Sequence, residues 1–174
     1  MKSLSLMCAG FCIILCPLFY SACNGDDDEL PPISMEGKNT FGCLVNGQLF
    51  VSKGRPGNVG TYAELQYAQD TIGINIYATN YETDQSLIFS FYDIPDLVED
   101  KRYFLHTQNY SVFYVTQNCD YRTDKLVDGW IELNKYDIKR PIISGTFEFT
   151  AYNPDCGDTI KVTNGRFDIG ELIR

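Results

Sequence analysis

Apolar side chains recur at every second position over most of this chain. The pattern is clearest in residues 72–78 and 147–151, where isoleucine, phenylalanine or alanine alternates with other residues. Because successive side chains of a strand point to opposite faces, each such segment predicts a strand with one face in a core. No window shows the sustained apolar spacing of an amphipathic helix. The alternation therefore predicts an all-β fold.

Turn-forming sequences separate the apolar segments. Asn46-Gly47 lies between two of them and is the strongest short signal for a β-hairpin. Residues 94–99 are expected to form a single helical turn. Consecutive strands without intervening helices favour a mainly antiparallel β-sandwich, with a closed or partly open antiparallel β-barrel as the alternative. We expect eight or so short strands, for which there are nine candidate segments: residues 41–45, 48–51, 63–67, 72–78, 87–92, 111–116, 129–136, 142–152 and 159–169.

The first 22 residues have the organisation of an export signal. Lys2 supplies a positive charge, and the apolar run over residues 4–20 is short for a membrane span. The small residues at 21 and 22 suit cleavage before Cys23, whose thiol then accepts a lipid. We interpret residues 1–22 as a lipoprotein signal peptide and Cys23 as the lipidation site. Tyr20 occupies a position that is usually aliphatic in a lipoprotein signal. Two alternatives therefore remain: an uncleaved membrane anchor, or an ordinary signal peptide cut near Ala22.

Residues 23–38 are expected to form a tether between the lipid and a single β domain over residues 39–174. The tether contains three aspartates and a glutamate in succession, followed by Pro31 and Pro32. Like charges repel one another and prolines favour extended chain, so the segment stays solvated. The acidic run just after Cys23 also resembles the surface-export signal of Bacteroidetes lipoproteins, with a plain spacer as the alternative. The resemblance implies a protein that is lipid-anchored in the outer membrane and exposed at the cell surface.

The charge balance bears on possible partners. The chain has a formal charge of −9, and removal of residues 1–22 takes away one lysine and no acid, which leaves −10. An acidic protein lacks the basic excess that releases counterions from nucleic-acid phosphates, so nucleic acid is not an expected partner. The membrane is a partner through the N-terminal lipid alone. We expect no cofactor and no metal site, since the chain has one histidine.

Processing leaves three cysteines in the domain. Cys119 and Cys156 both lie in turn-like sequences, so we expect them to form a disulfide in an exported protein. Cys43 lies within an apolar strand and is expected to be a small buried side chain. Thiol catalysis is disfavoured, because the single histidine, His106, would have to act as the base.

Aromatic residues are the first candidates for a ligand site. Trp130 is the only tryptophan, and a flat ring beside polar groups is the usual platform for a sugar. Tyr110 and Tyr114, which flank Phe113, are the next candidates. The alternative for all three is core or cross-strand packing, for which strands commonly use aromatic residues.

Carboxylates suggest a second and different kind of site. Asp93, Asp96, Glu99 and Asp100 lie within eight residues around Pro95. Two acids that face each other across a cleft can hydrolyse a glycosidic bond, whereas acids in a turn are usually solvated. The sequence contains no nucleophile elbow, phosphate-binding glycine loop or zinc motif, so we assign no catalytic residue.

Three segments of the domain resemble a known family. They are residues 39–47, 143–149 and 157–168, which contain the hairpin at Asn46-Gly47, the alternating run before Phe149 and the segment around Asn164-Gly165. These segments are similar to those of uncharacterised Bacteroidetes lipoproteins with small β domains. The resemblance implies a β fold, a lipid anchor and a bacterial envelope location. It implies no catalytic residues.

The sequence as a whole favours a non-enzymatic protein of the cell envelope. We expect an extracellular binding or accessory module, whose partner is a glycan, a peptide or another envelope protein. The alternative is a hydrolase of the glycoside class that uses Asp93 or Asp96 together with Glu99. A purely structural subunit with a flat apolar surface is a third possibility.

Overall fold

The computed structural model describes residues 29–68, 70–94, 97–105, 109–122 and 126–173. The predicted signal peptide and the predicted lipidation site at Cys23 lie outside these residues, as do Asp96 and His106. Asp93 belongs to a described strand, but its side chain is not described. Within the described ranges the chain forms twelve strands and no helix. No described helix therefore has the length and apolar character needed to cross a bilayer.

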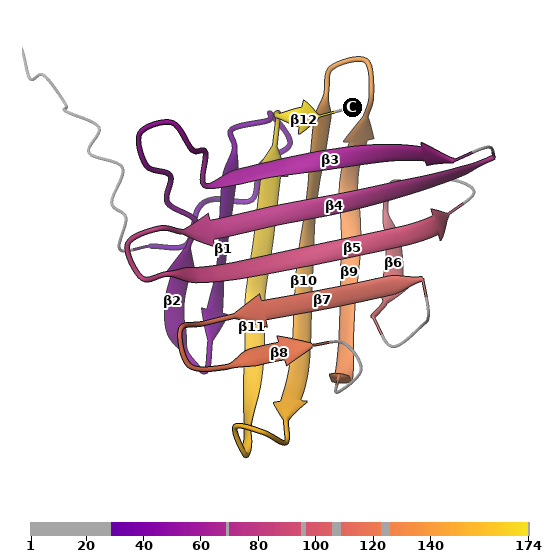
Figure 1. Cartoon of the computed structure of the whole chain (residues 1–174). Helices are drawn as coiled ribbons and strands as arrows, with labels where there is room; N and C mark the ends of the chain where they lie inside the picture. The colour runs from indigo at the N-terminus through magenta and orange to yellow at the C-terminus, as the bar shows by residue number, and fades with distance from the viewer. Residues whose placement is uncertain (1–28, 69, 95–96, 106–108, 123–125, 174) are drawn as a thin grey trace, which may run out of the picture.

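The strands form two sheets of six, which we name sheet A and sheet B (Figure 1). Sheet A has the order β2-β1-β11-β10-β9-β6, and sheet B has the order β12-β3-β4-β5-β7-β8. Neighbouring strands are antiparallel except for β12 and β3, which pair in parallel. Sheet A consists of β1 (Thr40–Val45), β2 (Gln48–Val51), β6 (Lys101–Phe104), β9 (Leu126–Asp137), β10 (Ile142–Asn153) and β11 (Asp158–Ile169). Sheet B consists of β3 (Thr61–Ala68), β4 (Thr71–Asn80), β5 (Gln85–Ile94), β7 (Tyr110–Val115), β8 (Asp120–Arg122) and β12 (Leu172–Ile173).

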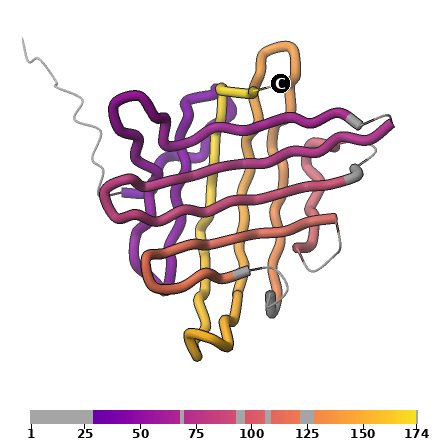
Figure 2. Tube along the Cα trace, in the orientation of Figure 1, coloured from indigo at the N-terminus to yellow at the C-terminus, as the bar shows by residue number. Residues whose placement is uncertain are grey.

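The two sheets pack face to face, and the strands of sheet B run across those of sheet A (Figure 1). Each described sheet ends in its own edge strands and does not close on itself. The predicted mainly antiparallel β-sandwich is therefore confirmed, and the alternative of a closed barrel is wrong. Figure 2 shows how the chain path brings the first strand, β1, beside β11, the last strand but one.

The hairpin predicted at Asn46-Gly47 joins β1 to β2. Both residues have positive φ, 50° for Asn46 and 80° for Gly47, as a tight hairpin turn with right-handed strand twist requires. The predicted helical turn at residues 94–99 is wrong where the chain is described, because Ile94 still belongs to β5 and Leu97 lies in irregular chain. Leu97 is 5% exposed, so its side chain is buried in the core without a helical turn.

The core between the sheets is dominated by phenylalanine rings. Phe147 of sheet A packs edge-on against Phe89 of sheet B, with ring centroids 4.8 Å apart, and lies 5.1 Å from Phe41. Cys43 is fully buried among these rings as expected, and burial raises the pKa of its thiol to about 12. A thiol in this state is neutral at physiological pH and behaves as an apolar side chain.

Three core phenylalanines of sheet A lie opposite glycines on a neighbouring strand. The cross-strand pairs are Phe147 with Gly165, Phe167 with Gly145, and Phe149 with Gly129. A β-carbon added at Gly165 would lie 2.4 Å from the ring of Phe147, and one at Gly145 would lie 2.7 Å from that of Phe167. The rings therefore occupy the space that side chains at these glycines would need. We call these pairs the Phe–Gly pairs.

Residues 34–38, at the end of the expected tether, are fastened to β11 by Asp168. This carboxylate is 1% exposed and accepts a hydrogen bond from the hydroxyl of Ser34. It also accepts hydrogen bonds from the backbone amides of Glu36, Gly37 and Lys38, at 3.1, 2.8 and 3.2 Å. Burial raises the pKa of the carboxyl, but the four hydrogen bonds outweigh burial and hold the pKa below its ordinary value.

A disulfide joins the two sheets at one end of the sandwich. It connects Cys119, in the turn between β7 and β8, to Cys156, in the turn between β10 and β11. This is the pair expected from the sequence. Nearby, the Tyr121 hydroxyl donates to Asp158 at 2.6 Å, and the Asn153 amide donates to a backbone carbonyl of β8. The short strand β8 is thereby fixed to sheet A.

Gly165→Ala tests the Phe–Gly pairs. The new methyl group overlaps the ring of Phe147, so we expect a loss of about 1–3 kcal/mol in the free energy of unfolding, measured by urea denaturation. Gly73→Ala in β4 is the matched control, because its β-carbon would meet its nearest neighbour at an ordinary 3.4 Å. Equal effects of the two substitutions would contradict the steric account.

Asp168→Asn tests the contact between residues 34–38 and β11. Loss of the charged acceptor is expected to cost about 2 kcal/mol of unfolding free energy at pH 7, whereas the exposed turn residue Asp155→Asn changes little. Because the folded-state pKa of Asp168 is lowered, its contribution is present above about pH 4 and is lost as pH falls through that pKa. Wild type should therefore lose more stability than the variant between about pH 5 and about pH 2. Parallel pH profiles would contradict the assignment.

Candidate functional site

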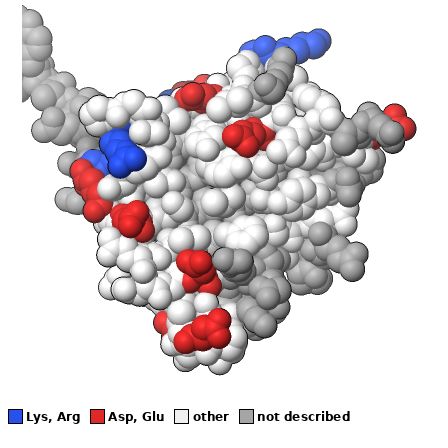
Figure 3. All heavy atoms as spheres, viewed as in Figure 1, with Lys and Arg blue, Asp and Glu red and all other residues white. Residues whose placement is uncertain are grey.

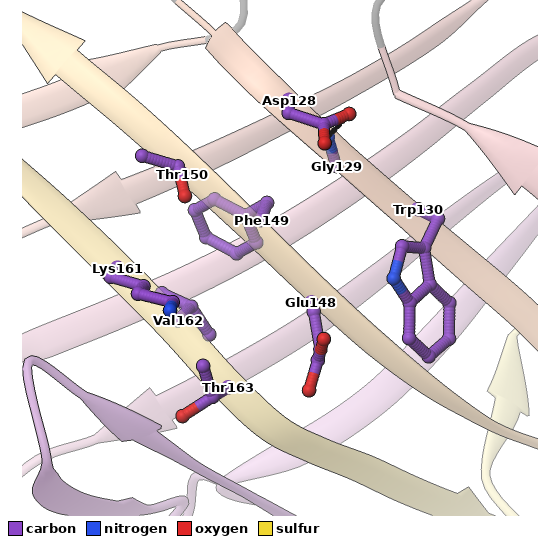
Figure 4. Close-up of a pocket in the computed structure, with 9 residues that line it drawn as sticks. All are labelled: Asp128, Gly129, Trp130, Glu148, Phe149, Thr150, Lys161, Val162 and Thr163. Atoms are coloured by element: carbon purple, nitrogen blue, oxygen red, sulfur yellow. Dashed lines mark hydrogen bonds between the residues drawn. The ribbon is translucent and has the colours of Figure 1, made fainter.

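The outer face of sheet A, which points away from the core, carries two adjoining hollows, the first of which is shown in Figure 4. Their volumes are about 290 and 250 Å³, and both are lined by Trp130 and Glu148. We call the two hollows together the Trp130 groove. The first is lined further by Asp128, Gly129, Phe149, Thr150, Lys161, Val162 and Thr163, and the second by Ile33, Thr146, Phe147, Asn164, Gly165 and Arg166.

Strand alternation places the polar side chains of the groove together. Ile131 and Phe147 point into the core, so their neighbours Trp130 and Glu148 point outward. Trp130 and Glu148 are also direct cross-strand partners on β9 and β10. An irregularity in the pairing of β10 with β11 follows Phe147, so the register shifts beside the groove.

The indole ring of Trp130 is held by an arginine from the edge strand β6. The guanidinium carbon of Arg102 lies 3.9 Å from the ring centroid, which is a close cation–π contact. Two nitrogens of Arg102 also donate to one carboxylate oxygen of Glu132, at 3.1 and 2.9 Å. The ion pair fixes the guanidinium over the indole, so the ring has a defined orientation before any ligand binds.

The groove presents both hydrogen-bond donors and acceptors. Lys161 and Thr163 come from β11, and Figure 4 shows them on the side of Glu148 away from Trp130. Arg166 lines the second hollow, where its guanidinium donates to the carbonyl of Asn164 at 3.1 Å. Acidic and basic side chains thus lie near one another, and the Trp130 groove has no excess of either charge. Such a surface suits an uncharged ligand rich in hydroxyl groups better than a strong anion or cation.

The structure does not bring the three predicted ligand residues together. Trp130 lies on the outer face of sheet A, whereas Tyr114 is 4% exposed and faces the core from sheet B. Tyr110 packs edge-on against Phe91 at 5.6 Å and beside Tyr103 at 5.4 Å. A joint patch of Trp130, Tyr110 and Tyr114 is therefore not formed. Tyr114 instead lines a separate cavity of about 400 Å³.

The predicted acid pair is described only in part. Asp96 and the side chain of Asp93 lie outside what the structure describes. Glu99 accepts hydrogen bonds from the Lys135 ammonium at 2.7 Å and from the Tyr136 amide at 3.0 Å. The hydrogen bond from Lys135 is the largest cause of a lowered pKa for Glu99. Glu99 thus forms an ion pair with Lys135 of β9.

The outer face of sheet B is a different kind of surface. Seen from the front, it carries few charged side chains (Figure 3). A cross-strand row of four residues runs over it, formed by Tyr62, Tyr77, Ile88 and Phe113. The rings of Tyr62 and Tyr77 stack at 4.7 Å, and all four side chains are half-buried. We interpret this row as cross-strand packing and assign no site to it.

The sequence analysis did not identify Arg102, Glu148 or Lys161 as parts of a site. The alternation of β10 and β11 shows that Glu148 and Lys161 point outward, but their proximity to Trp130 depends on strand pairing. Arg102 reaches the ring from a strand that is 28 residues earlier in the chain. In the part of the chain that is described, no three His, Cys, Asp or Glu side chains form a group that could hold a metal ion.

Comparison with known proteins identifies a protein family. Residues 57–169, more than half of the chain, match a family of protein domains described as a domain of unknown function (DUF6252). The matched segment runs from the loop before β3 to the end of β11, so it includes every strand that lines the Trp130 groove. No curated protein and no solved structure matches the chain.

Proposed function

This chain belongs to the DUF6252 family, a domain of unknown function, and from that premise we propose that it is a lipid-anchored protein of the bacterial envelope. In this proposal the β-sandwich is a non-enzymatic module that binds an extracellular saccharide in the Trp130 groove. The single observation that carries the proposal is the fixed indole ring set among carboxylate, ammonium and hydroxyl groups on a solvent-facing sheet.

The chemistry of the groove matches the chemistry of a sugar. The C–H groups on one face of a sugar ring pack against an aromatic ring, and its hydroxyls both donate and accept hydrogen bonds. Glu148 supplies acceptors, whereas Lys161 and Arg166 supply donors. Because Arg102 already fixes the indole, less side-chain freedom is lost when a ligand binds.

The shape of the groove favours a saccharide chain over a single sugar. The two hollows share Trp130 and Glu148 and lie to either side of them. An occupant that fills both hollows must extend past the indole in two directions. We therefore propose that the ligand is a stretch of several sugar units within a longer chain.

The proposed anchor rests on the sequence around Cys23 and on the resemblance to Bacteroidetes lipoproteins. Glu29, the first described residue, is six residues beyond Cys23, and an extended chain of that length spans roughly 20 Å. Pro31 packs over Gly42 of β1, and its carbonyl accepts from Arg166 of the groove. The domain would thus hold its ligand close to the membrane surface.

We propose binding without catalysis for a physical reason. The acid of a glycoside hydrolase needs a raised pKa so that it carries a proton at neutral pH. In the alternative hydrolase, which would use Asp93 or Asp96 with Glu99, only the Glu99 side chain is described, and its pKa is lowered by the hydrogen bond from Lys135. This residue is therefore poorly suited to act as the proton donor.

Trp130→Ala tests the saccharide site. Neutral oligosaccharides of six units, covering the common glucan, mannan, xylan and galactan linkages, would be titrated calorimetrically. We expect at least one to bind, and we expect the substitution to weaken that binding by about tenfold because the stacking surface is lost. Tyr67→Ala, an exposed aromatic residue on sheet B, is the control and should leave affinity unchanged. Absence of binding, or equal affinity of wild type and the Trp130 variant, would overturn the proposal.

Cys23→Ser tests the anchor independently. The full chain, expressed in a Gram-negative host fed with labelled palmitate, is expected to carry the label and to sediment with membranes. The substitution removes the thiol that accepts the lipid, so label and sedimentation should both be lost. Cys16→Ser, within the segment proposed to be cleaved, should keep the label. A labelled Cys23 variant would rule out this lipidation site.

A further inference from the structure

A second cavity lies at the side of the sandwich where three hairpin turns gather, at the left of Figure 1. The turns are β1–β2, β4–β5 and β7–β8, and each contributes one lining residue: Asn46, Thr83 and Thr116, respectively. The cavity has a volume of about 400 Å³. We call it the Tyr114 cavity. It opens between the edges of the two sheets, so it is separate from the Trp130 groove on the outer face of sheet A.

The floor of the Tyr114 cavity consists of aromatic rings held by packing. Tyr114 lies edge-on to Phe50 with centroids 6.3 Å apart, and 6.0 Å from Tyr121. All three side chains are at most 5% exposed. They come from both sheets, because Phe50 belongs to β2 and the tyrosines belong to β7 and β8. The floor is therefore preformed and apolar.

The rim offers neutral hydrogen-bonding groups. Gln48 and Gln85 line the cavity, and within the described chain neither side-chain amide has a hydrogen-bond partner. The Tyr114 hydroxyl likewise has no partner among the described residues, and burial raises its pKa to about 12, so it remains a donor. None of the residues that line the cavity carries a charge.

We infer that the Tyr114 cavity binds one neutral ring that carries hydroxyl groups at its edge, namely a single monosaccharide unit. A volume of about 400 Å³ is within the range of small-molecule sites. The small exposed part of the floor rings gives the sugar an apolar contact, and the amides of the rim suit its hydroxyls. A charged ligand would lose its hydration without gaining an opposite charge, so the cavity disfavours it. The unit is either a free sugar or the terminal residue of a chain.

The disulfide contributes to this site by fixing one of its walls. Cys119 lies three residues after Thr116 and two before Tyr121, both of which line the cavity. Its bond to Cys156, together with the hydrogen bond from Tyr121 to Asp158, ties that wall to sheet A. A wall held in place before binding reduces the entropy lost on binding. Reduction of the disulfide is therefore expected to weaken binding in this cavity.

The experiment uses saturation-transfer NMR with glucose, galactose, mannose and N-acetylglucosamine, each as the free sugar, the methyl glycoside and a disaccharide. We expect at least one of the four sugars to bind. The double variant Gln48→Ala/Gln85→Ala should raise its Kd at least fivefold, and Tyr114→Phe should do so with the ring retained. Gln66→Ala, an exposed glutamine on β3, is the matched control. Thermal unfolding of each variant verifies that it is folded.

The outcomes separate this inference from the saccharide site proposed above. Trp130→Ala should leave binding in the Tyr114 cavity unchanged, and the fluorescence of the single tryptophan should not respond to these sugars. Equal binding of all three forms of a sugar identifies the terminal unit of a chain as a ligand, whereas binding of the free sugar alone identifies the monosaccharide. Absence of binding by all four sugars, or a Kd that the glutamine variants leave unchanged, would overturn the inference.

Discussion

The Phe–Gly pairs of sheet A are the contacts on which the rest of the molecule depends. Phe147, Phe149 and Phe167 each lie opposite a glycine, and added β-carbons at Gly165 and Gly145 would lie within 3 Å of the partner rings. A shift of one residue along β10 would place side chains where the rings now lie, so the pairs fix the register of β9, β10 and β11. The rings of Phe147 and Phe149 then meet Phe89 of sheet B at the centre of the core, and Phe167 packs beside Phe147.

Two features on the other face follow from this register. Glu148 lies between two core phenylalanines in sequence, so it must point outward, directly opposite Trp130 on β9. Asp168 follows Phe167 and points to the side where residues 34–38 cross the sheet, which lets it accept their backbone hydrogen bonds. One steric constraint in the core thus positions both the Trp130 groove and the attachment of the N-terminal segment.

Local sequence patterns predicted much of the fold. Features that depend on the pairing of distant strands could not be predicted in this way. The alternation predicted the long strands, and Asn46-Gly47 predicted its hairpin, because both signals lie within a few residues. The parallel pairing of β12 with β3, the short strand β8 and the contact of Arg102 with Trp130 depend on residues far apart in sequence. Tyr110 and Tyr114 were candidates because they flank Phe113, yet alternation turns both toward the core and Phe113 outward. In β7 both alternating sets contain apolar or aromatic residues, so the local pattern there does not indicate which set faces the core.

The most direct test of the central claim, that the outer face of sheet A binds a saccharide at Trp130, is a ¹H–¹⁵N NMR titration of the domain. The indole N–H of the single tryptophan gives one isolated signal. With the hexasaccharide that binds most tightly, we predict that this signal shifts together with the backbone amides of Glu148 and Thr163, while the amides at the centre of sheet B stay unchanged. Shifts confined to sheet B, or a spectrum that the hexasaccharides leave unchanged, would contradict the account.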